Sequence, residues 1–326
     1  MAGRGSRLRP HTLTIPKPLI PIAGKPIVQR LVEDIARVCV ERITEIAFII
    51  GDFGSEIEHE LLDIAKKLGS KGTIYHQDEA LGTAHAILCA KESLKGPIIV
   101  AFADTLFRAE FVLDTSKDGI IWVQKVDDPN AYGVVKITQN GVITDFIEKP
   151  NEFVSNLAII GIYFFKDGIR LGRELQYLID NNIKEKGEFQ LTNALENMKV
   201  DGAKFYSGKV VEWLDCGNPP AAIYANKRIL EYAKNNEPRA GLLLENSSII
   251  EPCYIGSNVK ISNSTIGPHV SIGNNCVLNQ CTVSNSLIQN NSNIYKADLE
   301  KSMIGSRVDY TGNSKQISIG DYSKIG

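Results

Sequence analysis

The stretch CYIGSNVKISNSTIGPHVSIG, residues 253–273, decides the fold of the C-terminal part of this chain. Its aliphatic residues recur every five or six positions, at Ile255, Ile261, Ile266 and Ile272, with Asn, Ser and Gly between them. Neither a helical period nor the alternation of a strand fits this spacing. A hexapeptide repeat does fit, in which each unit forms one side of a triangular parallel β-helix and points its aliphatic residue inward.

The same spacing extends on both sides of this stretch, from Ile249 to Ile304. This persistence disfavours the alternative, a linker rich in Ser and Asn. Three cysteines lie within the repeat, and we interpret them as small core residues rather than metal ligands: Cys253, Cys276 and Cys281. Because the composition changes near Glu237-Pro238, we predict a β-helix domain over residues 239–326 and a first domain over residues 1–238.

Before residue 238, short apolar runs alternate with helical patterns. Two runs flank an Asn-Gly pair at residues 140–141, which is a strong hairpin signal. This alternation predicts an α/β fold with a Rossmann-like, mixed and mostly parallel sheet flanked by helices. The strands are expected at residues 45–50, 72–76, 97–103, 119–125, 133–138, 142–147 and 157–164, and helices at 54–68, 83–94 and 219–234.

Composition excludes several classes of protein. The 326 residues include 36 Lys and Arg against 38 Asp and Glu, so the net charge of -2 gives no basic excess for nucleic acid. No apolar run approaches the ~20 residues of a membrane span. The six cysteines contain no Cys-x-x-Cys pair, which is typical of reduced residues in a cytoplasmic protein. We therefore expect a cytoplasmic protein that binds neither nucleic acid nor membranes.

The start of the chain is rich in glycine and cations: Gly3-Arg4-Gly5-Ser6-Arg7-Leu8-Arg9-Pro10, followed by Pro16-Lys17-Pro18-Leu19. Glycines let backbone amides approach a phosphate chain, and the cations neutralise its charge. The segment lacks the Gly-Lys-Ser/Thr ending of a P-loop and the third glycine of a dinucleotide-binding loop. Taken alone, such a short loop is more often an ordinary turn.

With the motifs that follow it, this segment resembles the signature of sugar-1-phosphate nucleotidylyltransferases. The resemblance covers about residues 1–236, and a C-terminal left-handed hexapeptide β-helix is a familiar architecture in that family. The further motifs occur in the family's order: Ala23-Gly24-Lys25-Pro26, Gln77 with Leu81-Gly82-Thr83-Ala84, Asp104, Tyr132-Gly133-Val134-Val135, Glu148-Lys149-Pro150, Asn156 to Gly161, Tyr163, Gly187-Glu188, and Trp213-Leu214-Asp215-Cys216-Gly217.

The resemblance implies an enzyme that joins a nucleoside triphosphate to a sugar-1-phosphate with Mg²⁺ and releases pyrophosphate. It implies catalytic roles for Arg7, Lys17 and Lys149, and metal ligation by Asp104 and Asp215. It also implies two sets of binding residues: Ala2, Gly3, Gly5, Ser6, Gln77, Gly82 and Thr83 for the nucleotide, and Tyr132, Gly133, Glu148, Lys149, Asn156 and Gly161 for the sugar phosphate.

The chemistry of this reaction suits these residue types. The attacking atom is already an anionic phosphate oxygen, so catalysis reduces to holding two anions in line and cancelling their repulsion. Mg²⁺ commonly takes one or two carboxylates and completes its shell with phosphate oxygens and water. Taken alone, Asp104 also fits a turn or a helix cap, and Tyr132-Gly133 fits an ordinary hairpin turn.

Several alternatives stay open for the substrates. A Gln77 amide offers a donor and an acceptor to a pyrimidine, so dTTP or UTP is favoured, with glucose-1-phosphate as the sugar. The alternatives are a GTP-dependent mannose-1-phosphate guanylyltransferase, a bifunctional enzyme whose β-helix also transfers acetyl groups through a base such as His269, and a catalytically weak regulatory subunit. We expect a homo-oligomer formed through the β-helix.

The chain begins inside the glycine loop, at Met1-Ala2-Gly3. In the family that this segment resembles, a buried strand precedes the loop and lies in the middle of the sheet. We therefore expect a longer natural chain that carries this strand, because its loss would leave backbone groups without partners.

Overall fold

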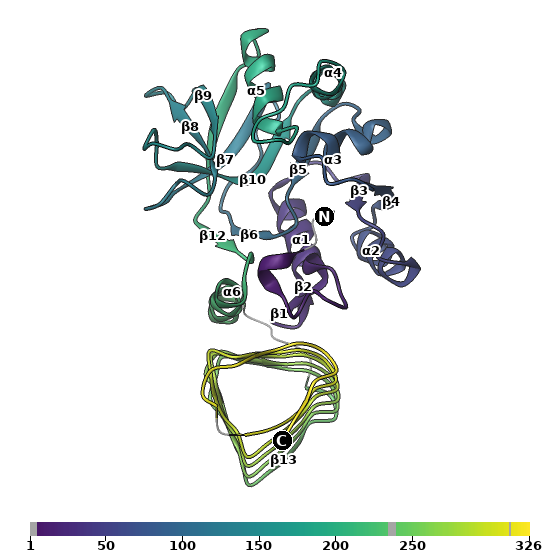
Figure 1. Cartoon of the computed structure of the whole chain (residues 1–326), viewed down its shortest axis with the longest axis vertical. Coiled ribbons are helices and arrows are strands. Elements are labelled where there is room, and N and C mark those ends of the chain that lie inside the picture. The colour runs from purple at the N-terminus through teal and green to yellow at the C-terminus, as the bar shows by residue number, and fades with distance from the viewer. Residues whose placement is uncertain (1–4, 234–238, 313) are drawn as a thin grey trace. The chain divides into compact units, whose positions relative to one another are not determined.

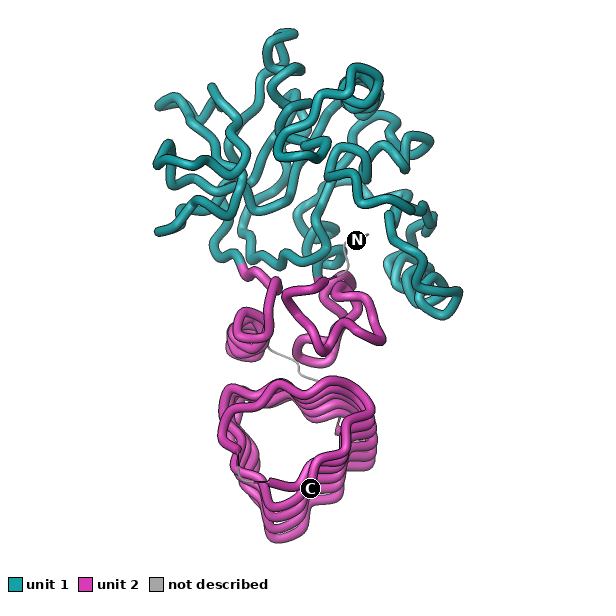
Figure 2. Tube along the Cα trace, viewed as in Figure 1, with its two compact units in different colours: residues 1–3, 31–213 teal, residues 4–30, 214–326 magenta. Residues whose placement is uncertain are grey.

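The computed structural model describes residues 5–233, 239–312 and 314–326. These residues divide into two compact units (Figure 2): the sheet unit, residues 31–213, and the solenoid unit, residues 5–30, 214–233, 239–312 and 314–326. The glycine-rich start and the helix at residues 219–232 thus group with the C-terminal repeat. The domain boundary that the sequence predicts at residue 238 lies outside the described residues.

The sheet unit contains a six-stranded sheet in the order β11-β7-β10-β8-β9, with β5 on a second branch beside β10. Two further pairs accompany it: β3 with β4, and β6 with the start of β12. The strands are β3 (Glu45–Ile50), β4 (Lys71–His76), β5 (Ile98–Ala101), β6 (Thr105–Arg108), β7 (Gly119–Lys125), β8 (Gly133–Ile137), β9 (Ile143–Glu148), β10 (Leu157–Phe165), β11 (Phe205–Lys209) and β12 (Glu212–Asp215).

The strand directions correct one part of the predicted fold. The sheet is mixed, as expected, but it is not mostly parallel. Strand β10 runs antiparallel to β5, β7 and β8, and β8 runs antiparallel to β9. Among the described residues of this sheet, only β11 and β7 pair in parallel. The Asn-Gly turn explains the β8–β9 pair, because a short turn joins antiparallel strands whereas parallel neighbours need a long crossover. The direction of β10 follows instead from its pairing with the distant strands β5 and β7.

Helices of the sheet unit form where caps and apolar periodicity coincide. Asp167 caps α4 by accepting from Arg170 N at 3.0 Å. Three helices were not predicted, namely α1, α4 and α5, and the predicted helix at 83–94 ends at Cys89 and continues as a 3₁₀ turn. The bounds are α1 (Ile27–Val38), α2 (Ser55–Lys67), α3 (Thr83–Cys89), η3 (Lys91–Ser93), α4 (Gly168–Asp180) and α5 (Leu191–Val200).

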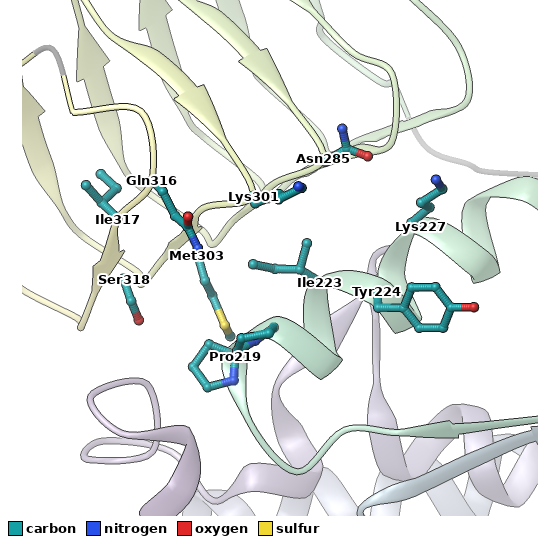
Figure 3. A pocket seen from close by; sticks show the side chains of 11 residues that line it. Pro219, Ile223, Tyr224, Lys227, Asn285, Lys301, Met303, Gln316, Ile317 and Ser318 are labelled. Atoms are coloured by element: carbon teal, nitrogen blue, oxygen red, sulfur yellow. The ribbon is translucent and has the colours of Figure 1, made fainter. Parts of the chain in front are cut away.

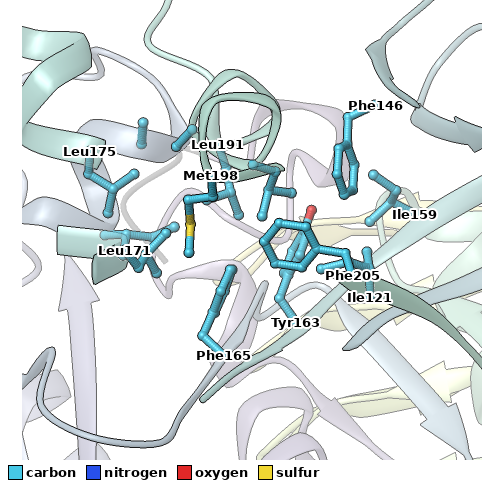
Figure 4. Close-up of a cluster of buried hydrophobic side chains, with 14 of the residues drawn as sticks. Ile121, Phe146, Ile159, Tyr163, Phe165, Leu171, Leu175, Leu191, Met198 and Phe205 are labelled. Atoms are coloured by element: carbon cyan, nitrogen blue, oxygen red, sulfur yellow. The ribbon is translucent and has the colours of Figure 1, made fainter. Parts of the chain in front are cut away.

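The core of the sheet unit lies between the six-stranded sheet and helices α3, α4 and α5 (Figure 4). Phe165 and Phe205 come from β10 and β11, and their rings meet edge to face at 6.2 Å. Leu171 and Leu175 of α4 and Met198 of α5 pack against the same cluster. This burial fixes the helices on one face of the sheet and leaves the loops at the strand ends for binding.

In the solenoid unit, residues 5–26 form short elements and α6 follows residue 218. Asn218 caps α6 through Ala221 N at 3.0 Å, and Pro219 and Pro220 occupy its first turn, where a missing N–H costs nothing. The elements are η1 (Ser6–Leu8), η2 (Lys17–Leu19), β1 (Pro21–Ile22), β2 (Lys25–Pro26) and α6 (Pro219–Tyr232).

The C-terminal repeat forms a parallel β-solenoid with three faces (Figure 1), which confirms the predicted β-helix. Its strands stack in register, and the repeat shortens from 17 to 16 and then to 15 residues along the solenoid. The three faces are β13 (Leu243–Glu245), β16 (Lys260–Ser262), β19 (Val277–Asn279), β22 (Asn293–Tyr295), β25 (Asp309–Thr311) and β27 (Lys324–Ile325); β14 (Ser248–Ile249), β17 (Thr265–Ile266), β20 (Thr282–Ser284) and β23 (Asp298–Glu300); and β15 (Cys253–Ile255), β18 (Val270–Ile272), β21 (Leu287–Ile288), β24 (Met303–Ile304) and β26 (Ser318–Ile319).

The repeat residues have the roles that their spacing predicts. Ile261, Leu278 and Ile294 lie inside the solenoid with at most 1% exposure. Cys276 is fully buried there, and burial raises the pKa of its thiol to about 11, so it is a core residue. No helix among the described residues is long and apolar enough to cross a membrane.

Candidate active site

The predicted sugar-phosphate residues come together at the end of the β8–β9 hairpin. Gly133 and Glu148 are directly opposed in its register, and Lys149 N donates to Tyr132 O at 3.1 Å. Lys149 then leaves the hairpin with φ 42, and its Nζ lies 3.6 Å from Glu148 Oε1. The hairpin thus presents a cation and a carboxylate side by side, which suits a ligand with both phosphate and hydroxyl groups.

The Glu148 side chain is mostly buried, with 12% of its surface exposed. Burial raises the pKa of this carboxyl, while Lys149 and the hydrogen bond from Thr192 Oγ1, at 3.3 Å, act in the opposite direction. A Cβ on Gly133 would come within 3.1 Å of Glu148 Oε2, so glycine leaves room for the carboxylate and for a ligand beside it. Glu148 is therefore an oriented acceptor in a largely desolvated position.

The other residues predicted to bind the sugar lie in the neighbouring strand β10 and in the segments that precede β8 and β10. Gly161 lies at an irregularity in β10 with φ 82, and its carbonyl accepts from Phe102 N at 2.8 Å. A Cβ there would be 3.0 Å from the Phe102 ring, so this position requires glycine. The Tyr132 ring meets Trp213 edge to face at 5.1 Å. Asn156 precedes β10, and its carbonyl accepts from Val126 N at 2.9 Å.

The predicted base-binding residues form a second group at the start of α3. Gln77 follows β4 and is 8% exposed. Its amide nitrogen lies 3.2 Å from Gly82 O and 3.0 Å from His85 Nδ1. A carbonyl only accepts, so the contact with Gly82 orients the Gln77 amide. Gly82 has φ 112, and a Cβ there would lie 2.7 Å from Phe189 N, so the loop closes tightly on the segment before α5.

Sequence reasoning missed several residues that support these two groups. Thr192 bonds Glu148, and Lys186 Nζ donates to Lys149 O at 2.5 Å. Thr83, which the sequence assigns to the nucleotide, donates to Gln190 Oε1 at 3.3 Å and accepts from Leu191 N at 2.9 Å. The Gly187-Glu188 motif was the available signal, since it immediately precedes the start of α5, where these partners lie.

In the solenoid unit, the glycine-rich loop brings Gly5 and Lys17 together. Gly5 has φ 57 and begins η1, and a Cβ there would lie 3.2 Å from Lys17 Cβ. Thr12 Oγ1 donates to Gly5 O at 2.8 Å and closes the loop. Ser6 and Arg7 are exposed on it, whereas Lys17 is 8% exposed. The predicted residues Ala2 and Gly3 lie outside the described residues.

The two predicted metal ligands lie at strand ends. Asp104 is in the tight turn after β5, where Thr105 N donates to Phe102 O at 3.2 Å. Asp215 ends β12, and a Cβ on Gly217 would come within 2.9 Å of its Oδ1 and 3.0 Å of its Oδ2. Gly217 thus leaves space around the Asp215 carboxylate. Both side chains are partly exposed, and carboxylate oxygens of this kind fit Mg²⁺. Among the described residues, no three His, Cys, Asp or Glu side chains cluster as a metal site.

A pocket of about 680 Å³ lies within the solenoid unit, between α6 and one edge of the solenoid (Figure 3). Ile223 and Pro219 of α6 face Met303 and Ile317 of the solenoid, and Lys227 and Lys301 stand at its rim. None of the predicted site residues lines it. The pocket is therefore a feature separate from the predicted active site.

Comparison with known proteins gives the family. Residues 1–232 match the family described as Nucleotidyl transferase. The low-salt glycan biosynthesis nucleotidyltransferase Agl11 of Haloferax volcanii is 34% identical over 238 residues, which are 70% of this chain and 64% of that relative. The chain therefore spans less than two thirds of the length of this relative.

Two further comparisons extend the match. The glucose-1-phosphate thymidylyltransferase of Streptomyces antibioticus is 31% identical in an alignment that covers 99% of this chain and 97% of that relative. A crystal structure of UDP-glucose pyrophosphorylase complexed with UDP-glucose superposes with a TM-score of 0.58 at 26% identity, over 72% of this chain and 97% of that one. Since the family match covers well over half of the chain, and one relative aligns over nearly its full length, this chain belongs to the nucleotidyl transferase family.

Proposed function

We propose that this protein transfers a nucleotidyl group from a nucleoside triphosphate to a sugar-1-phosphate. The observation that carries the proposal is the pairing of the mostly buried Glu148 with Lys149, whose Nζ lies 3.6 Å from Glu148 Oε1 beside Gly133. A cation next to a desolvated acceptor is the combination that a phosphorylated sugar requires. The full-length similarity to a glucose-1-phosphate thymidylyltransferase supports the same substrate class.

The reaction needs little covalent chemistry from the protein. A phosphate oxygen of the sugar-1-phosphate forms a bond to the α-phosphorus, and the bond from that phosphorus to the bridging oxygen of the β-phosphate breaks. The electron pair leaves with pyrophosphate, so no proton has to be removed from the nucleophile. The task of the protein is to align two anions and to offset their repulsion.

We assign the parts of this task to the residues of the two units. Lys149 binds the phosphate of the sugar-1-phosphate, and Glu148 accepts hydrogen bonds from sugar hydroxyls. In the solenoid unit, Arg7 and Lys17 bind the triphosphate beside the backbone of Gly5 and Ser6. Each assignment matches charge to charge: ammonium and guanidinium groups to phosphates, and a carboxylate to hydroxyl donors.

The orientation of Gln77 favours a base that presents an N–H group. Because the amide nitrogen of Gln77 faces Gly82 O, its carbonyl oxygen is left to accept from the base. Uracil, thymine and guanine carry a ring N–H on the pairing edge, whereas the ring nitrogen of adenine on that edge is an acceptor and its donor is the exocyclic amino group. We therefore propose dTTP or UTP as the donor and glucose-1-phosphate as the acceptor, with GTP and mannose-1-phosphate as the alternative pair.

We propose Mg²⁺ as the cofactor, with Asp104 and Asp215 as the residues that would hold it. Both are partly exposed carboxylates at strand ends, and Gly217 leaves room beside Asp215. When bound, Mg²⁺ would neutralise part of the negative charge of the triphosphate. Arg7, Lys17 and Lys149 would offset the rest.

The test is pyrophosphate release by the purified full chain with Mg²⁺ and glucose-1-phosphate, offered dTTP, UTP, GTP and ATP separately. We expect turnover with dTTP or UTP and none with ATP. Turnover with GTP and mannose-1-phosphate alone would support the alternative pair. A folded sample that releases no pyrophosphate with any of these donors, from glucose-, mannose- or glucosamine-1-phosphate, would contradict the proposed reaction.

The bifunctional alternative finds less support in the solenoid. His269, the base that the sequence offers for acetyl transfer, occupies a corner with φ 61, and its Nε2 lies 3.3 Å from Glu231 of α6. We infer that this histidine joins α6 to the solenoid. Acetyl transfer from acetyl-CoA to glucosamine-1-phosphate would decide the point. For assembly, we retain the proposal of a homo-oligomer through the solenoid, which light scattering of the full chain would test.

A further inference from the structure

The last coils of the solenoid bind the chain's own glycine-rich loop. His11 Nε2 lies 2.9 Å from Ser318 Oγ, and Thr14 Oγ1 donates to Asp321 Oδ2. Between these two contacts, Pro10 packs on Gly320, where an added Cβ would lie 2.8 Å from Pro10 Cβ. Residues 10–14 therefore lie directly on β26 and the residues that follow it, 318–321, although about 300 residues of sequence separate them.

Burial makes this contact hard to replace. His11 is 3% exposed, and its Nδ1 is buried without a hydrogen-bond partner among the described residues. The bond from Nε2 to Ser318 is therefore the hydrogen bond that the described structure provides for this ring. Asp321 is held as well, because its Oδ1 accepts from Ser306 N at 2.6 Å. One carboxylate thus joins the solenoid backbone to the loop.

The same loop is held at its other end by an earlier part of the solenoid. Asn226 of α6 accepts from Ala23 N at 3.0 Å and from Ser271 Oγ at 2.6 Å through the same Oδ1. Its Nδ2 donates to His269 O at 3.3 Å. Asn226 is fully buried. A Cβ on Gly24 would overlap the ring of Tyr254, so the loop and the solenoid approach closely there too.

The residues assigned to the triphosphate lie next to these anchors: Gly5, Ser6 and Arg7 precede the first one, and Lys17 lies between the two. Thr12 lies between the two residues that contact the last coils, His11 and Thr14, but its own Oγ1 donates to Gly5 O at 2.8 Å. Gly5 packs on Thr12 and Lys17, since a Cβ on it would meet Thr12 Cγ2 at 3.1 Å and Lys17 Cβ at 3.2 Å. A continuous set of contacts therefore runs from Ser318 and Asp321, through residues 10–14, to Gly5 and Lys17.

We propose that the solenoid is a scaffold for triphosphate binding, in which Ser318 and Asp321 are positioning residues for the glycine-rich loop. The inference rests on the proposed function for what the loop binds, but not for the contacts themselves. A loop with Gly5 in a left-handed conformation must be held in place to aim several donors at one anion. The last coils supply this restraint without touching the substrate.

Two measurements on the full chain test the proposal. The first is hydrogen–deuterium exchange of residues 5–19 in Ser318→Ala and in Thr14→Val. We expect exchange in this loop to be at least about fivefold faster, with exchange at residues 253–304 unchanged, because only local opening is affected. The matched control is Ser248→Ala: Ser248 also begins a solenoid strand, and its hydroxyl bonds Thr265 within the solenoid. This variant should leave loop exchange unchanged.

The second measurement separates KM from kcat. In Ser318→Ala we expect KM for the nucleoside triphosphate to rise at least about fivefold while KM for the sugar-1-phosphate stays within about twofold, and Ser318→Thr, which keeps the hydroxyl, should restore the first value. If Ser318→Ala does not fold, Thr14→Val serves for both measurements.

If residues 5–19 exchange in the variants at the same rate as in the wild type, the proposal is wrong. Faster exchange with an unchanged KM for the triphosphate would overturn it too. If the wild type is inactive on every substrate pair, the proposed function fails, and the exchange data alone decide whether the solenoid holds the loop.

Discussion

At the scale of single residues, Lys149 has the most direct predicted effect on activity. Lys149→Ala removes the cation beside Glu148, and a charge-assisted hydrogen bond to phosphate contributes about 1.5–3 kcal/mol. We expect KM for the sugar-1-phosphate to rise about 10- to 100-fold, with KM for the triphosphate within about twofold. Steady-state kinetics with each substrate varied in turn will measure this.

The same variant has a pH signature. Lys149 lowers the pKa of Glu148 against the effect of burial, so without Lys149 the Glu148 pKa rises further. The ionised Glu148 carboxylate accepts from hydroxyls through both oxygens, whereas the protonated acid loses part of that acceptor capacity. The acid limb of activity should therefore move to higher pH. Lys136→Ala, an exposed lysine on the same hairpin, is the control. If Lys149→Ala has the same kinetics and pH profile as Lys136→Ala, Lys149 is not part of the site.

Gly82 allows a prediction about stability. In Gly82→Ala the new Cβ would lie 2.7 Å from Phe189 N, at a backbone φ of 112. Gly202 has a similar φ of 88 but nothing within 4 Å of an added Cβ, so Gly202→Ala carries the backbone cost alone. We expect the free energy of unfolding of Gly82→Ala to be about 1–3 kcal/mol lower than that of Gly202→Ala. Equal denaturation midpoints would show that the loop adapts without cost.

At the scale of elements, the corners of the solenoid are stabilised by stacked asparagines. Asn258, Asn275 and Asn291 all have φ near 60. Asn258 Nδ2 donates to Asn275 Oδ1 at 3.3 Å, and Asn275 Nδ2 donates to Asn291 Oδ1 at 3.1 Å. Asn tolerates this conformation better than other residues with a Cβ. The stack therefore combines a backbone preference with a side-chain hydrogen bond from coil to coil.

Two substitutions at Asn275 separate these contributions. Asn275→Gly keeps the left-handed backbone but loses the side-chain bonds, whereas Asn275→Ala loses both. We expect the free energy of unfolding to fall by about 1–2 kcal/mol in Asn275→Gly and by a further ~1 kcal/mol in Asn275→Ala. Chemical denaturation of the three proteins measures both steps. If Asn275→Ala is more stable than Asn275→Gly, the left-handed conformation of this corner does not contribute to stability as proposed.

The sequence predicted those elements whose cause is local. The aliphatic spacing from Ile249 to Ile304 sets the solenoid, because every coil buries the same positions. The hairpin at residues 133–148 follows from its Asn-Gly turn. The direction of β10 and the helices α1, α4 and α5 were not predicted, since they depend on which distant strands β10 pairs with and on packing against the sheet. In the site, Lys149 and Glu148 are adjacent in sequence and were found, whereas Thr192 reaches Glu148 only through the fold.

At the scale of the whole molecule, the start of the chain and the last coils of the solenoid fold as parts of one compact unit. No hexapeptide pattern predicts this, because His11 and Ser318 meet through contacts between segments at opposite ends of the sequence. His11 is 3% exposed, so it packs inside this unit. The consequence is that a titratable group lies at the junction that closes this unit.

This junction should make stability depend on pH. Burial lowers the pKa of His11 from 6.5 to about 4, although the negative charge of Asp321 acts in the opposite direction. Below about pH 6.5 the unfolded chain binds a proton at His11 that the folded chain does not bind until about pH 4. The free energy of unfolding therefore falls as the pH is lowered through this range, by about 2 kcal/mol between about pH 7.5 and about pH 5.

Carboxylates also titrate near the lower end of this range, so the test compares two proteins. The free energy of unfolding is measured at both pH values for the wild type and for His11→Gln, whose amide can still bond Ser318. The wild type should lose about 2 kcal/mol more than the variant. Parallel losses would mean that the His11 ring is protonated in the folded chain as readily as in the unfolded one, and that the contact between the loop and the last coils is open to water.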